Sequence, residues 1–152
     1  MDFIINIDKQ LFYFFNVSLA NPLFDYLMPI LTNQKNWLPI YLALFLFIII
    51  RYKKNGFYIL FAIFLAASLG DYINSSIIKE MVGRLRPCAT LSDIHLLVSC
   101  GPGKSFMSSH AVNNFSLAYV LSFYFKENKW IFYTLASLVA YSRVAVGVHY
   151  PL

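Results

Sequence analysis

The stretch NGFYILFAIFLAASLGDYINSSII, residues 55–78, is apolar along almost its whole length and contains one charged side chain, Asp71. An α-helix needs about 20 such residues to cross the hydrocarbon core of a bilayer. A strand of a membrane β-barrel would alternate apolar and polar residues, and this stretch does not. It therefore predicts a membrane-spanning helix.

Charged residues divide the rest of the chain into four further apolar blocks, at residues 10–34, 36–50, 105–125 and 130–142. Asp25 and several polar residues interrupt the first block, which predicts a span of poor quality. We therefore expect an all-α, polytopic membrane bundle with about five spans, and a sixth span beyond Leu152. Residues 1–152 would form a single integral-membrane domain whose outer loop, residues 80–106, carries part of the site.

The overall composition agrees with this class. The chain is 59% hydrophobic and only 12% charged, whereas soluble domains contain about 25% charged residues. Its net charge of +5 is spread along the chain, without a run of basic residues interleaved with aromatic ones. Nucleic acid is therefore not an expected partner, and the bilayer is.

The short turns predict an orientation. RYKKNG, residues 51–56, and KENK, residues 126–129, are basic and lie on one side of the membrane if each block between them crosses once. Basic turns favour the cytoplasm, so residues 79–104 would face outward. That segment also has four basic residues, so a plain charge count leaves the orientation open unless these four belong to the site. We expect a bacterial inner-membrane protein with this side toward the periplasm or exterior.

Three polar groups fall on the outer side, and the first contains Lys79 and Arg86. Gly83 predicts a helix end between them, and the residue before Pro87 avoids helical geometry. Lys79 would then lie near a helix end and Arg86 in an extended loop. Taken alone, such residues also suit simple contact with lipid headgroups.

The second group opens the block at residues 105–125. Ser108 or Ser109 predicts a helix N-cap, with His110 in the first turn. The unpaired N–H groups of a helix start bind phosphate readily, although an ordinary capped helix would look the same in sequence.

The third group contains Arg143 and His149, six positions apart. On a regular helix this spacing places them on different faces. They converge only if the helix ends between them, which Gly147 permits. Otherwise each is a polar residue at the membrane rim.

Together the three groups resemble the signature of the type 2 phosphatidic acid phosphatase family, K-x6-RP, then P-S-G-H, then S-R-x5-H-x3-D. The matching residues are Lys79, Arg86, Pro87, Ser108, His110, Ser142, Arg143 and His149. Met107 and Ser109 replace the proline and the glycine of the second element. The final acid would follow Leu152 directly, so we expect the natural chain to continue with Asp and a last span.

The resemblance implies a metal-independent phosphatase that works through a phosphohistidine. His149 would be the nucleophile, His110 would protonate the leaving oxygen, and Arg143 would stabilise the transition state. The groups that bind the phosphate would come from Lys79, Arg86, Ser108, Ser109 and Arg143. No cofactor is expected, because three histidines and few acids offer no convincing metal-ligand set.

The substrate would be a phosphorylated lipid that reaches the site from the bilayer. Undecaprenyl diphosphate, phosphatidylglycerophosphate, phosphatidate and a lipid A phosphate are all compatible with the pattern. The alternative is a membrane protein that binds phosphate without catalysis, such as a transporter component.

Three further residues lie in the outer loop. Cys88 and Cys100 are candidates for a disulfide, because an outward-facing loop lies in an oxidising compartment. His95 is expected to be a solvated residue.

Overall fold

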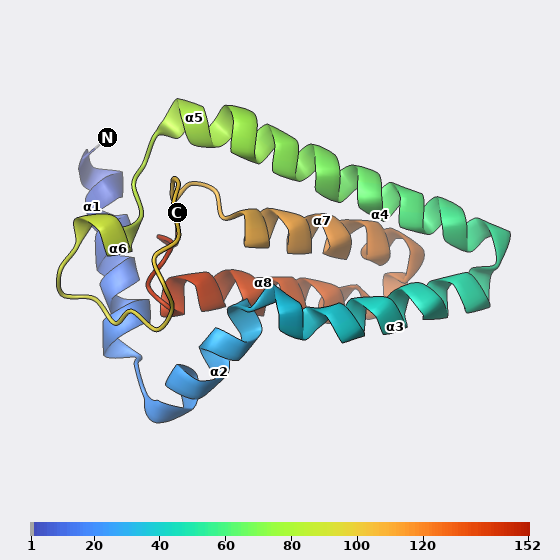
Figure 1. Cartoon of the computed structure of the whole chain (residues 1–152), viewed down its shortest axis with the longest axis horizontal. Helices are drawn as coiled ribbons and strands as arrows, with labels where there is room; N and C mark the ends of the chain where they lie inside the picture. Colours follow the sequence, from blue (N-terminus) through green and yellow to red (C-terminus); the bar gives the residue numbers. More distant parts are fainter. Residues whose placement is uncertain (1) are drawn as a thin grey trace.

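The computed structural model describes residues 2–152, so that only Met1 of the expected domain lies outside it, and these residues form helices and loops without strands (Figure 1). The expected all-α class is confirmed. The elements are α1 (Asp2–Tyr13), η1 (Phe14–Ser18), α2 (Pro22–Thr32), α3 (Gln34–Tyr52), α4 (Lys54–Ile73), η2 (Asn74–Ile78), α5 (Lys79–Val82), α6 (Pro87–Thr90), α7 (Ser109–Tyr124), η3 (Lys126–Asn128) and α8 (Lys129–Ala145).

Four long helices, α3, α4, α7 and α8, run side by side and form the body of the protein (Figure 1). A turn at Lys53 joins α3 to α4, and η3 joins α7 to α8. Between α3, α4 and α7 lies an apolar core made of Ile48, Ile59, Ile63, Val120 and Leu121. Close packing of these side chains holds the helices together, because van der Waals contact rather than the hydrophobic effect joins helices within a bilayer.

The outer surface of the bundle is apolar. α3 and the segment that begins with α4 are long and apolar enough to cross a membrane, yet only 11% and 17% of their apolar windows are buried. The core helix of a soluble protein would be mostly buried, so these side chains suit contact with lipid. α7 and α8 have 16 and 17 residues, and the expected count of five spans stays a prediction.

The N-terminal third is divided into short elements, in agreement with the expected poor span. α1 lies across one end of the long helices (Figure 1), and the π-helical turn η1 follows it. The side chain of Asn21 then caps α2 by accepting a hydrogen bond of 3.0 Å from the N–H of Phe24.

The helices that carry the polar groups begin or end where the sequence predicts. α5 ends at Val82, and Gly83 takes a left-handed conformation with φ of 65°. Ser108 is the N-cap of α7, and α8 ends at Ala145, before Gly147.

The loop between α5 and α7 lies at the end of the bundle that α1 crosses (Figure 1). A disulfide joins Cys88 to Cys100, with Cα atoms 5.9 Å apart. The two basic turns lie at the opposite end, where the rings of Tyr52 and Phe125 are 5.6 Å apart. The polar loop and the basic turns are thus separated by the length of the helices.

Candidate functional site

Arg143 and His149 converge, as the sequence predicts. The backbone folds back after α8, so that the N–H groups of Val148 and His149 both donate to the carbonyl of Arg143 at 3.2 Å. Gly147 allows this turn because its φ is +86°, a conformation that other residues adopt at a cost. Both side chains are buried, with 8% of Arg143 and 3% of His149 exposed.

Two cavities meet at Arg143. One, of about 390 Å³, is lined by His149, Ser108 and Arg143 together with apolar residues of α7 and α8. The other, of about 370 Å³, is lined by Arg86 and Arg143 and by the outer loop. Arg143 therefore lies between Arg86 on one side and Ser108 and His149 on the other.

The start of α7 is tied to the end of α4. Lys79 donates a hydrogen bond of 2.9 Å to the hydroxyl of Ser109, the residue that stands in place of the glycine of the signature. The buried amide of Asn74 donates to the carbonyl of Met107 at 3.0 Å and accepts from its N–H at 3.3 Å. These bonds fix the segment that precedes Ser108.

The imidazole of His149 has a defined orientation. Its Nδ1 lies 2.5 Å from the carbonyl oxygen of Ser105, and a carbonyl only accepts, so Nδ1 carries the proton. Burial, and next the charges of Arg143 and Arg86, lower the pKa of His149 to about 3. The ring is therefore neutral at pH 7, with a lone pair on Nε2.

His110 is the second residue of α7, as expected. It does not line the cavity that contains His149. Arg143, Arg86 and Lys79 are nevertheless close enough to act on it electrostatically. His110 is thus placed beside the basic cluster rather than within it.

Three predicted phosphate ligands contain buried polar atoms without a protein partner, namely the hydroxyl of Ser108 and the Nε atoms of Arg86 and Arg143. Among residues 2–152, Lys79, Arg86 and Arg143 form no ion pair with a carboxylate. A buried positive charge without a counter-ion is unfavourable. The site is therefore suited to an anion that supplies both negative charge and acceptor oxygens.

A metal centre is not offered by the described part of the chain, where no three His, Cys, Asp or Glu side chains are grouped closely enough to hold an ion. The site is basic instead. Its electrostatic character comes from Lys79, Arg86 and Arg143.

His95 is partly solvent-exposed, as expected, but it also has a polar partner. Its Nε2 lies 2.8 Å from a carboxylate oxygen of Asp25, and its side chain is 38% exposed. The residue therefore links the outer loop to α2. Sequence gave no indication of this contact, because the partners are 70 positions apart.

Sequence reasoning also missed residues that support the site. Thr32, at the end of α2, accepts a hydrogen bond of 2.6 Å from Nη1 of Arg143. Ser105 acts through its backbone carbonyl, which no residue-type pattern reveals. The buried asparagines Asn16 and Asn74 were missed as well.

The fold and the site together define a helical membrane protein with a basic centre at one end of the bundle. Residues 55–152 match the PAP2 superfamily, and the chain belongs to it. The expected family is thereby confirmed.

Two curated relatives are similar over 99% of this chain. One is the lipid A 4'-phosphatase of Bacteroides thetaiotaomicron, 34% identical, and the other is the lipid A 4'-phosphatase of Porphyromonas gingivalis, 28% identical. The chain spans 70% and 66% of their lengths. The crystal structure of Aquifex aeolicus LpxE is similar with a TM-score of 0.73 and 25% identity, over 95% of this chain and 83% of that one.

Family membership and the named activities of these relatives support the expected class, a phosphatase of lipid phosphates. The relatives and the exposed apolar helices also identify the chain as a membrane protein. The roles of single residues, the particular lipid and the orientation are matters for proposal.

Proposed function

We propose that this protein removes a terminal phosphate from a membrane lipid, with His149 as nucleophile. The observation that carries the proposal is the set of unpartnered polar atoms on Ser108, Arg86 and Arg143 around a neutral, oriented imidazole. A phosphate would give these groups their missing partners. The reaction would need no metal ion.

In the first step the lone pair of Nε2 attacks phosphorus, and the bond between phosphorus and the lipid oxygen breaks. His110 gives its proton to that oxygen. In the second step a water molecule, deprotonated by His110, attacks the phosphohistidine and releases inorganic phosphate. Lys79, Arg86 and Arg143 stabilise the negative charge on the transferred phosphoryl group.

The proposed substrate is the 4'-phosphate of lipid A. The two similar curated relatives are named for this activity, at 34% and 28% identity. A lipid substrate also suits the surroundings, because the site lies at one end of helices with an apolar surface. A water-soluble phosphate compound would not need a site next to an apolar helix surface.

A phosphate-release assay with purified protein tests this function. We expect turnover of lipid A in the presence of EDTA, at a rate above that on phosphatidate, phosphatidylglycerophosphate or undecaprenyl diphosphate. A faster rate on one of those lipids would make that lipid the substrate in place of lipid A. Tight binding of phosphate without release from any lipid would favour the alternative, a binding protein without catalysis.

The proposed orientation places the site on the outer face of the bacterial inner membrane. It is supported by the basic turns at residues 51–56 and 126–129, which lie at the opposite end of the bundle from the site. A cysteine at Asn55, in a variant with both native cysteines replaced by serine, should react only with membrane-permeant reagents. One at Asp93 should react with impermeant reagents, and the reverse pattern would contradict the orientation.

A further inference from the structure

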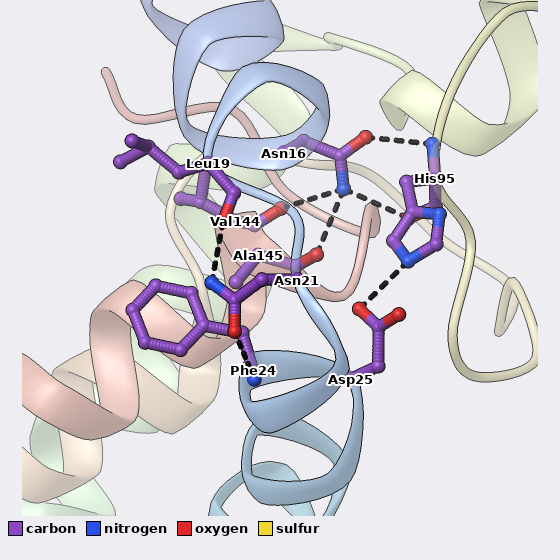
Figure 2. Close-up of polar contacts among 8 residues, drawn as sticks. All are labelled: Asn16, Leu19, Asn21, Phe24, Asp25, His95, Val144 and Ala145. Carbon is purple, nitrogen blue, oxygen red and sulfur yellow. Dashed lines mark hydrogen bonds and ion pairs between the residues drawn. The ribbon is translucent and has the colours of Figure 1, made fainter.

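Asn16 lies in the N-terminal third, far from the family signature in sequence, and is completely enclosed, with 1% exposed. It is part of the π-helical turn η1. Such turns interrupt an α-helix and are frequent at functional sites. Its side chain points into the junction between the outer loop and the end of α8 (Figure 2).

The amide of Asn16 bonds to both of these segments (Figure 2). Its Nδ2 donates to the carbonyls of His95 and Ala145, each at 2.8 Å, and approaches that of Val144 at 3.4 Å. Its Oδ1 accepts from the N–H of His95 at 2.9 Å. The carbonyls at the end of a helix lack intrahelical partners, and here Asn16 supplies one.

These contacts bear directly on the site. Val144 and Ala145 follow Arg143 and begin the turn that returns His149 to the carbonyl of Arg143. The packing leaves little room for movement, since a Cβ on Gly147 would lie 3.0 Å from the carbonyl oxygen of His95. The position of the His149 backbone is therefore linked to that of Asn16.

We propose that Asn16 is a positioning residue, which fixes the turn between Arg143 and His149 against the outer loop and thereby places the attacking imidazole. The inference rests on the proposed phosphatase function. Misplacement of a reacting group by about 1 Å costs about 100-fold in rate. Loss of the Asn16 amide should have an effect of that size.

Asn21 offers a matched control. It lies in the same part of the chain and makes hydrogen bonds of similar length, to the carbonyl of Leu19 and from the N–H of Phe24. These partners are two and three positions away, whereas Ala145 is 129 positions from Asn16. Asn21→Ala should therefore weaken the local structure without moving the site.

The test compares Asn16→Ala, Asn16→Asp and Asn21→Ala in the full chain, with lipid A as substrate. Asn16→Asp keeps the acceptor for the N–H of His95 and loses the donors to the carbonyls of His95 and Ala145. Both Asn16 variants should lower kcat by about 100-fold and change KM by less than about threefold. Asn21→Ala should stay within about threefold of wild type in kcat.

A second readout does not depend on turnover. The chain has three histidines, so ¹⁵N NMR of the labelled imidazoles can follow His149 separately. In wild type and Asn21→Ala, its Nδ1-protonated tautomer should persist, because Ser105 holds that proton. In the Asn16 variants we expect a mixture of tautomers.

The protonation midpoint of His149 should also rise in the Asn16 variants. Burial lowers the pKa of His149 most, the cations Arg143, Arg86 and Lys79 that face the imidazole lower it further, and the bond to Ser105 opposes them. In the Asn16 variants the turn would move away from Arg143, so the repulsion between Arg143 and a protonated His149 would weaken. His110 also lies beside this basic cluster, so both imidazoles are followed in the titration.

The outcomes separate the two proposals. An inactive wild type would reject the proposed function, and the His149 signal would still decide the role of Asn16. An unchanged tautomer and midpoint in both Asn16 variants would overturn the inference, whatever the rate. If Asn16→Ala does not fold, Asn16→Asp is judged by the same criteria.

Discussion

His149→Ala is expected to lower phosphate release from lipid A by about 10⁴-fold or more, the scale seen when an enzyme loses its nucleophile. The imidazole is buried, neutral at pH 7 and held through its Nδ1 by Ser105. Alanine provides no atom that can accept the phosphoryl group. The assay is the initial rate of phosphate release by purified, membrane-inserted protein.

The matched control is His95→Ala. His95 also lies at the site end of the bundle, but its side chain bonds to Asp25, and Asn16 contacts only its backbone. The control should keep most of the activity. Rapid quenching should also trap an acid-labile phosphoryl group on wild type and none on His149→Ala. Near-full activity of His149→Ala would refute the assignment of the nucleophile.

The sequence predicted the features of the site that depend on local chemistry. Gly83 ends a helix, Ser108 precedes one, and Gly147 allows the turn that joins Arg143 to His149. The two glycines act through local backbone freedom, and Ser108 takes the N-cap position of α7 without a hydrogen bond from its side chain. The three groups became a predicted site only through their resemblance to the family signature, because each group alone also suits an ordinary membrane rim.

The contribution of the N-terminal third could not be predicted in this way. Sequence showed only its apolar character, yet its polar side chains contact the segments that carry the site. The contacts join Asp8 to Arg84, Asn16 to Ala145, Asp25 to His95 and Thr32 to Arg143. The partners in these pairs lie between 70 and 129 positions apart, and no periodic pattern marks such long-range pairing.

The hydrogen-bond partner of the His149 ring is a second feature that the sequence alone could not predict. The family signature places an aspartate four positions beyond His149, directly after Leu152, whereas in the described residues the carbonyl of Ser105 lies on Nδ1. A backbone carbonyl belongs to every residue type. Its role depends on the position of the loop, which Asn74 fixes through the backbone of Met107, and not on the identity of the serine.

The second large effect is expected at Arg143. It lies between the cavities that contain His149 and Arg86, and its Nε has no protein partner. Arg143→Met should remove about 3 kcal/mol or more of transition-state stabilisation, or about 150-fold in kcat/KM. Arg143→Lys should recover little, because an ammonium cannot reproduce the planar fork of donors.

A stability measurement distinguishes this effect from misfolding. Methionine keeps the apolar stem of arginine and removes a buried charge that lacks a counter-ion, so Arg143→Met should unfold close to the wild-type temperature without phosphate. Inorganic phosphate should stabilise wild type and not the variant.

Thr32→Val, which removes only the hydrogen bond of 2.6 Å to Nη1, should cost about tenfold or less in kcat/KM, since the charge remains. If Arg143→Met kept more than a tenth of wild-type kcat/KM, Arg143 would not hold the transferred phosphoryl group.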